Sequence, residues 1–120
     1  MDLDHVQIAI PAGGETQVRH FFGDVLGLSE IAKPARLGSY GCWFELGDRQ
    51  LHFGVDPDFR PARKAHVAIA VPEIAAVRTK LEGVGYEVRA DVPVDGRTRF
   101  FTDDPFGNRI EFIEAASSVD

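Results

Sequence analysis

The sequence predicts an α+β fold made of two similar half-domains. The stretch "HVQIAIP" at residues 5–11 returns at residues 66–72 as "HVAIAVP". A second pair, "GDRQLHF" at residues 47–53 and "GNRIEF" at residues 107–112, matches near the end of each half. With 120 residues the chain has the length of about one domain, and each half alone is too small to bury a full core. A repeated first strand and a repeated last strand therefore indicate pseudo-twofold symmetry.

The first half begins with a strand followed by a helix. From Asp4 to Ile10 apolar residues alternate with the others, which is typical of a strand with one face on a core. Residues 15–28 carry apolar side chains at helical spacing, with Thr16 as the expected N-cap and Gly27 near the C-terminal end. We expect this helix to cover the apolar face of the strand, so that His5 points away from the core.

Two further strands complete the first half. Residues 42–46 and 50–55 have strand character and are separated by the turn "GDR". Ile31 either begins another short strand or lies in a loop. The order is then β-α-β-β or β-α-β-β-β.

A connector and a second copy of this order follow. Residues 57–64 are rich in proline and charge and read as a linker. The second half shows a strand at 65–71, a helix at 72–83 and strands at 86–92, 98–102 and 109–114, with the turn "DDPFGN" before the last. We expect a single domain over residues 1–120, with module 1 at about 3–56 and module 2 at about 65–114.

Composition excludes several classes of partner. The net charge of −6 gives no electrostatic footprint for nucleic acid or an anionic membrane. No stretch has the length of a membrane-spanning segment or of a secretory signal. The chain has one cysteine, Cys42, which has no internal disulfide partner, so the expected location is the cytoplasm.

Strand parity predicts a cluster of polar side chains. Leu51 and Phe53 belong on the helix-covered face, so His52 turns the other way, and the same parity turns Glu111 away from the core. His5 and His66 lie on this face of the repeated first strands. If the two sheets curl toward one another, the four polar side chains converge near the symmetry axis.

Such a cluster suits a divalent metal ion. Half-buried imidazoles and a carboxylate are costly unless something satisfies them, and a metal does so directly. His5, His66 and Glu111 are the expected ligands, and His52 is either a fourth ligand or a satisfied strand residue. Nitrogen and oxygen ligands without thiolate admit Zn, Mn, Fe, Co or Ni. Small neighbours such as Ala9 and Ala68 would leave room for a ligand.

Other side chains share this face. Trp43 and Gln50 are candidate substrate contacts, although Trp43 also suits core packing. Arg99 and Phe101 are two further candidate substrate contacts. An arginine in the cavity would bind a carboxylate or phosphonate, and the alternative is that it lies on a solvated strand face. Glu45 shares the parity of Trp43. Cys42 has the opposite parity, which argues against a nucleophilic thiol.

The stretches "HVQIAIP", "HVAIAVP" and "DDPFGNRIEF" resemble the vicinal oxygen chelate superfamily, which includes glyoxalase I, fosfomycin-resistance thiol transferases, extradiol dioxygenases and bleomycin-resistance proteins. The resemblance covers Leu3 to Glu114. It implies two βαβββ modules whose curled mixed sheets enclose one cavity, with the helices outside. It also implies a homodimer whose modules pair within or across chains.

By position, His5, His66 and Glu111 resemble the metal ligands of the fosfomycin-resistance type. His52 stands where glyoxalase I has a glutamate ligand that moves protons, which puts that proton shuttle in doubt. Trp43 matches an aromatic residue that lines the cavity in the fosfomycin enzymes, and Phe101 falls where they have a tyrosine.

The resemblance implies a glyoxalase-like, divalent-metal-dependent enzyme of lyase or isomerase type, acting on a small molecule chelated through adjacent oxygens. Glu111 is the expected proton-transfer group and Glu45 the second choice. A fosfomycin-resistance-like thiol transferase or an extradiol-type dioxygenase is one alternative. A metal-free antibiotic-binding protein of the bleomycin-resistance type is another.

Overall fold

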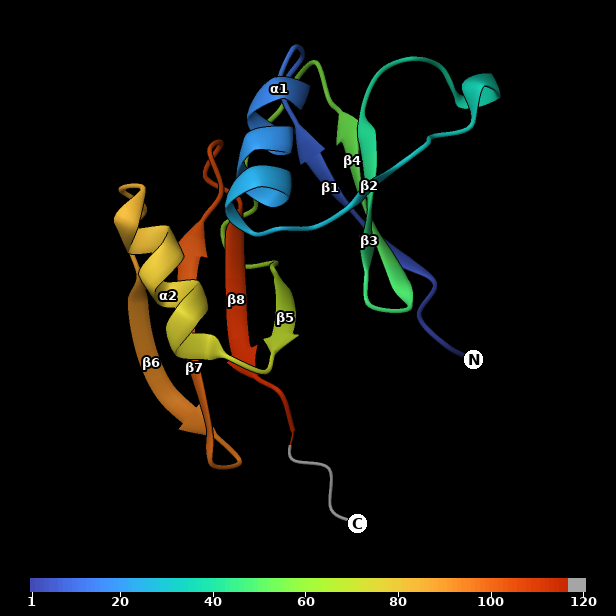
Figure 1. Cartoon of the computed structure of the whole chain (residues 1–120). Coiled ribbons are helices and arrows are strands. Elements are labelled where there is room, and N and C mark those ends of the chain that lie inside the picture. Colours follow the sequence, from blue (N-terminus) through green and yellow to red (C-terminus); the bar gives the residue numbers. More distant parts are fainter. Residues whose placement is uncertain (117–120) are drawn as a thin grey trace. The chain divides into compact units, whose positions relative to one another are not determined.

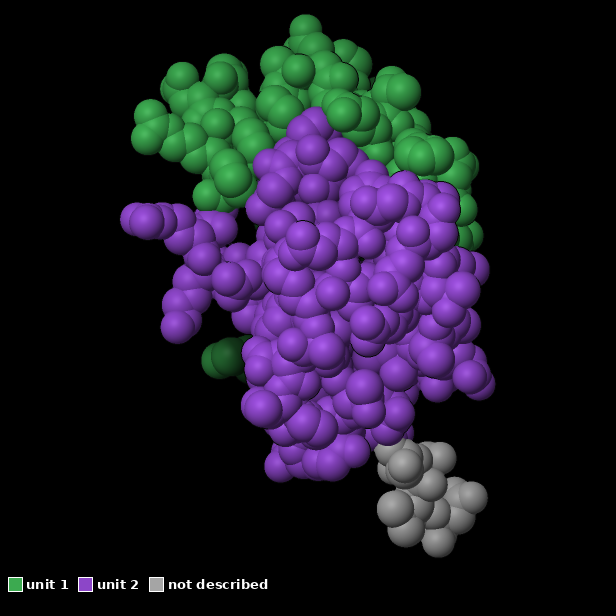
Figure 2. Space-filling view, turned by 90° about the vertical axis from the view of Figure 1, so that its left-hand side faces the viewer, with its two compact units in different colours: residues 1–61 green, residues 62–120 purple. Residues whose placement is uncertain are grey.

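The computed structural model describes residues 1–116, and the chain divides into two compact units, Met1–Pro61 and Ala62–Asp120 (Figure 2). The boundary lies within the segment that the sequence predicts as a linker. Each unit carries one open, mixed four-stranded sheet with a helix over one face (Figure 1). The α+β class and the two βαβββ modules are therefore confirmed. Within the described residues, every helix falls short of the length and apolar character needed to span a membrane.

Unit 1 contains four strands in the order β1-β4-β3-β2. Its elements are β1 (His5–Ile10), α1 (Glu15–Val18), η1 (Arg19–Val25), β2 (Glu30–Ile31), η2 (Ala35–Leu37), β3 (Cys42–Leu46) and β4 (Arg49–Val55). Strand β4 pairs in parallel with β1 and antiparallel with β3. The short strand β2 settles the alternative left open at Ile31 in favour of β-α-β-β-β.

The helix of unit 1 differs from the sequence prediction. Only its first four residues are α-helical, and η1 continues as a seven-residue π-helix. The N–H of Leu26 donates to the carbonyl of Phe21 at 3.0 Å, a step of five residues. The N-cap is Gly14, without a side-chain cap hydrogen bond, so the assignment of Thr16 as the cap was wrong. Gly27 follows the C-cap with φ +79°, a conformation that glycine adopts without strain.

The core of unit 1 lies between this helix and one face of the sheet. The rings of Phe22 and Phe53 are 4.6 Å apart, and those of Phe44 and Phe53 are 5.9 Å apart in an edge-to-face arrangement. All three side chains are buried, as is Leu51. The opposite face of the sheet is therefore not covered by this helix.

Unit 2 repeats this plan with the strand order β5-β8-β7-β6. Its elements are β5 (Val67–Val71), α2 (Ile74–Gly83), β6 (Arg89–Val94), β7 (Arg97–Asp103) and β8 (Arg109–Glu114). Leu81 of α2 is buried together with Phe100 and Phe112, whose rings are 5.4 Å apart. Strand β5 begins one residue after His66, whereas the sequence predicted a start at Ala65.

The strand registers show the internal symmetry directly. In unit 1 His52 lies opposite Gln7, two residues after His5. In unit 2 Glu111 lies opposite Ala68, two residues after His66. The same offset in both sheets shows that the two halves repeat one strand plan.

Candidate metal-ligand and substrate sites

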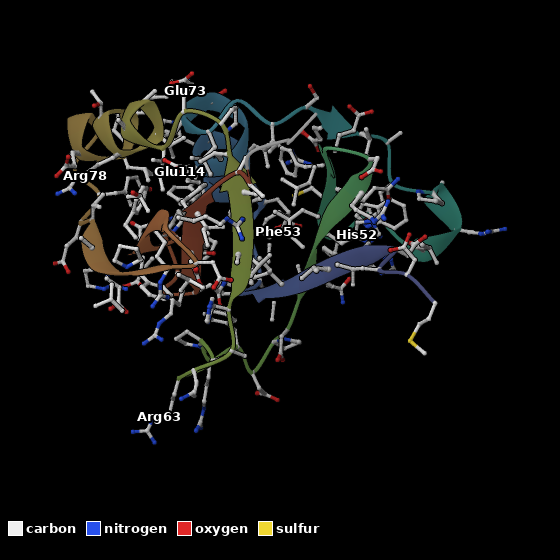
Figure 3. All side chains as sticks on the ribbon, turned by 90° about the horizontal axis from the view of Figure 1, so that it is seen from below. His52, Phe53, Arg63, Glu73, Arg78 and Glu114 are labelled. Atoms are coloured by element: carbon white, nitrogen blue, oxygen red, sulfur yellow. The ribbon has the colours of Figure 1, made fainter. Side chains whose placement is uncertain are left out.

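The open face of unit 1 is the face of its sheet opposite the helix. Register pairs place on it His5, Gln7, Ala9, Trp43, Glu45, Gln50, His52 and Gly54. Figure 3 labels the consecutive residues His52 and Phe53, whose side chains lie on opposite sides of β4. The strand-parity argument therefore holds for every candidate in this unit.

Three rings stack on this open face. The ring centroids of Trp43 and His52 are 3.7 Å apart, and the two ring planes are parallel to within 1°. The ring of His5 lies 4.2 Å from that of His52 on a 23° angle. Burial, and then the proximity of His5, lowers the pKa of His52 from its usual 6.5. This shift favours the neutral form of the imidazole, which is the form that binds metal ions.

Hydrogen bonds fix which ring nitrogen is left for a ligand. The Nδ1 atom of His5 lies 2.8 Å from Oδ1 of Asp4 and, because a carboxylate only accepts, it carries the hydrogen. This bond lowers the pKa of Asp4. The Nε2 atom of His52 lies 2.8 Å from Oε1 of Gln50. Nε2 of His5 and Nδ1 of His52 then keep a lone pair each that could bind a metal ion. We call His5 and His52 the donor pair of unit 1, in the sense of metal-ligand donors.

In unit 2 the corresponding donor pair is His66 and Glu111. The Nε2 atom of His66 lies 3.0 Å from Oε1 of Glu111, and its Nδ1 lies 3.0 Å from the carbonyl oxygen of Lys64. Nδ1 therefore carries a hydrogen. Nε2 of His66 and Oε1 of Glu111 face each other at a spacing that also suits two ligand atoms of one metal ion. Glu111 is 8% exposed, so its carboxyl group has little contact with water.

Arg99 and Phe101 surround this pair. The Nη1 atom of Arg99 lies 3.7 Å from Oε2 of Glu111, and its Nε donates to the carbonyl of Val92 at 2.8 Å. The ring of Phe101 lies edge-on to His66 with centroids 5.3 Å apart. In register, Phe101 faces Glu111 as Trp43 faces His52. An aromatic residue thus stands beside each donor pair.

The structure brings the four candidate ligands together as two pairs, one in each unit. Within residues 1–116, no group of three or more His, Cys, Asp or Glu side chains lies close enough together to hold a metal ion. Glu45 is exposed on β3 and faces Gln50 in register. Cys42 is buried, and burial raises the pKa of its thiol to about 11, which agrees with its exclusion as a nucleophile.

Sequence reasoning missed the partners of the histidine rings. Asp4 directly precedes His5 and Lys64 lies two residues before His66, each just outside a strand. The acidic residue before His5 was a visible signal, since carboxylate partners commonly orient ligand imidazoles. The carbonyl of Lys64 leaves no signal in the sequence, because every residue has one.

Comparison with known proteins gives consistent results. The family model described as the Glyoxalase/Bleomycin resistance protein/Dioxygenase superfamily matches residues 3–112. The solved structure of a protein from Bacillus anthracis assigned to the glyoxalase family is 43% identical, with a TM-score of 0.91 over 97% of this chain and 96% of that chain. None of the curated proteins compared matches the chain.

Two more distant structures share the fold. Lactoylglutathione lyase from Agrobacterium tumefaciens is 18% identical, with a TM-score of 0.76 over 94% of this chain and 92% of that chain. The genomically encoded fosfomycin resistance protein FosX from Listeria monocytogenes is 13% identical, with a TM-score of 0.77 over 97% and 94%.

Proposed function

Because the chain belongs to the Glyoxalase/Bleomycin resistance protein/Dioxygenase superfamily, we propose that it is a glyoxalase-like enzyme that uses a divalent metal ion. The substrate would be a small molecule that presents two adjacent oxygens. The observation that carries this proposal is the way the imidazoles are held. In each unit the histidine that leads the first strand donates its Nδ1 hydrogen to an oxygen acceptor and presents Nε2.

The donor set suits such an ion. We propose His5, His66 and Glu111 as ligands, with His52 as the fourth. Two ligand atoms about 2.1 Å from one metal and at right angles are about 3.0 Å apart. The Nε2 atom of His66 and Oε1 of Glu111 are 3.0 Å apart. A carboxylate or carbonyl on the other ring nitrogen is the usual support of a ligand imidazole, and Asp4 and Lys64 supply it.

The residues imply a division of roles. When bound, the metal would supply Lewis acidity toward the adjacent oxygens of the substrate. Glu111 would accept and return the proton at its carboxylate, since it is the buried carboxylate of the donor set, and Glu45 is the second choice. Gln50 would hold the ring of His52 through its side-chain oxygen.

Three side chains would contact the substrate itself. Trp43 lies against His52 and Phe101 lies beside His66, so each can pack against substrate carbon atoms near a donor pair. Arg99 would contribute positive charge near Glu111. The homodimer implied by the resemblance belongs to this proposal, and the mass of the protein in solution by light scattering tests it.

Metal analysis tests the proposal. Protein reconstituted with Zn, Mn, Fe, Co or Ni and then dialysed is expected to retain about one ion per chain. His66→Ala and Glu111→Gln should lose it, with the far-ultraviolet circular dichroism unchanged. His20→Ala removes an exposed histidine of η1 outside both pairs and is the matched control.

The stoichiometry separates the outcomes. One ion per chain that disappears on mutation of His5 as well as His66 supports a single ion shared by both pairs. Two ions per chain, each lost with its own pair, would contradict the shared site. No retained metal under any of these conditions would refute the enzyme proposal and favour a metal-free binding protein.

A further inference from the structure

Unit 1 contains a cavity of about 590 Å³ beside Trp43. This volume lies within the range of about 300–1,000 Å³ that small-molecule pockets occupy. Residues of β1, β3 and β4 and of the segments before and after them line it: Gln7, Ala12, Gly13, Lys33, Leu37, Tyr40, Trp43, Phe53, Gly54, Val55 and Pro57. Because Trp43 also stacks on His52, the cavity adjoins the donor pair of unit 1.

Part of the cavity wall is apolar and exposed to water. Leu37 and Tyr40 line it from the segment between β2 and β3, yet their side chains are 57% and 74% exposed. Exposed large apolar side chains grouped around a concavity favour an apolar ligand. Trp43 and Tyr40 add aromatic surfaces, which favour a flat ring over a branched chain.

Gly54 and Gln7 pack closely in the wall of the cavity. Gly54 lies opposite Ala9 in register, and a Cβ atom at Gly54 would come within 2.9 Å of the side chain of Gln7. A larger residue here would displace Gln7. The absence of a side chain at position 54 therefore makes room for the amide group of Gln7.

One side chain gives the cavity a charge. Lys33 is the charged residue among those that line it, all of which are described, and they include no carboxylate. Its Nζ donates to the carbonyl oxygens of Leu37 and Gly38, both at 2.9 Å. An ammonium group has three N–H donors, so one is left for an anion in the cavity. The same bonds hold the segment that carries Leu37 in place.

We propose that this cavity binds the organic part of the substrate, and that the substrate is an aromatic carboxylate. The ring would pack between Trp43, Tyr40 and Leu37, and the carboxylate would pair with Lys33. The assignment of this ligand as the substrate rests on the proposed function. The binding itself does not require a metal.

Tryptophan fluorescence tests binding in this cavity directly, because Trp43 is the single tryptophan of the sequence. The probes are biphenyl-4-acetate, the neutral 2-(biphenyl-4-yl)ethanol and the cationic 2-(biphenyl-4-yl)ethylamine, added to the metal-free full chain. Biphenyl-4-acetate is expected to change the Trp43 emission saturably and to bind about five- to tenfold more tightly than the alcohol. The amine should bind most weakly. Equal affinity for all three probes, or no saturable change, would overturn the proposal.

Variants separate charge recognition from loop support. Lys33→Gln should abolish the preference for the acetate while leaving the affinity for the alcohol within about twofold. Lys80→Gln makes the same charge change on the exposed face of α2 and should have no effect. An equal loss for acetate and alcohol in Lys33→Gln would show that Lys33 only supports the loop, and the carboxylate assignment would fail. Leu37→Ala and Tyr40→Ala should weaken all three probes.

This result is independent of the metal analysis. A chain that retains metal but binds no probe refutes the substrate class and leaves the proposed function standing. A chain that binds biphenyl-4-acetate through Lys33 but retains no metal refutes the enzyme proposal and leaves a carboxylate-binding cavity.

Discussion

Replacing Arg99 by glutamine is expected to change stability and metal affinity in opposite directions. The guanidinium Nη1 lies 3.7 Å from Oε2 of Glu111, and the two side chains are 15% and 10% exposed. At an effective dielectric constant of about 20, two unit charges at this distance attract by about 4–5 kcal/mol. Desolvation of both charges offsets much of this attraction. We therefore expect Arg99→Gln to lower the free energy of unfolding of the metal-free protein by about 1–3 kcal/mol.

The effect on metal affinity has the other sign. If Glu111 is a metal ligand as proposed, Arg99 would compete with the cation for this carboxylate, and its charge would repel a divalent ion. Removing it should strengthen metal binding by about 1–2 kcal/mol, which corresponds to about 5–30-fold in the dissociation constant. A residue that only supports the fold would weaken binding when it is removed.

The assay pairs urea unfolding of the metal-free protein with a competition titration of Mn²⁺ or Zn²⁺ against a chelating dye at fixed ionic strength. Arg97→Gln is the matched control on the same strand, because the Nε of Arg97 donates to the backbone carbonyl of Glu114 and not to Glu111. Metal affinity that is unchanged or lower in Arg99→Gln, while stability falls, would refute the electrostatic reasoning. It would also argue against Glu111 as a ligand.

Three other perturbations test the fold and the donor pair. Gly41→Ala should destabilise unit 1 by about 3 kcal/mol or more in urea, since Gly41 has φ +82° and an added Cβ would collide with the carbonyl oxygen of Phe53. Asp104→Ala should cost about 2–4 kcal/mol by the same assay, because its buried carboxylate accepts two backbone N–H bonds and one from the side chain of Asn108, each at 2.9 Å. Because the pKa of His52 is lowered in the folded protein, the imidazole of the unfolded chain takes up a proton at a higher pH than that of the folded chain as pH falls below 6.5. Its contribution to stability is therefore complete above that pH and is lost as pH falls through the folded pKa, which the pH dependence of unfolding in wild type and His52→Gln would show. A contribution that grows on acidification would contradict this sign.

Strand parity made the faces of the sheets predictable. Side chains alternate along a strand, so the buried Leu51 and Phe53 fix the direction of His52 without knowledge of the rest of the fold. The repeat then extended the argument to Glu111, which has the same offset from its neighbouring strand. Local rules and one internal comparison were sufficient here.

Other features depend on contacts that no local rule encodes. Within about one turn, an α-helix and a π-helix both place residues i, i+1 and i+4 on one side, so the spacing of Phe21, Phe22 and Val25 does not separate them. The ion pair between Arg99 and Glu111 depends on side-chain rotamers across two strands. Parity placed Arg99 on the correct face but left its partner undetermined.

The two halves keep one backbone plan but differ in the chemistry of their donor pairs. At equivalent register positions unit 1 has His52 and unit 2 has Glu111. Unit 1 thus offers two imidazoles in an aromatic stack with Trp43, which also lines a cavity that contains the ammonium group of Lys33. Unit 2 offers an imidazole and a buried carboxylate under a guanidinium. A neutral imidazole bound to a metal is a poor base, whereas a carboxylate can exchange a proton. On the proposed function, unit 1 would therefore bind the organic part of the substrate and unit 2 would carry out the proton transfer.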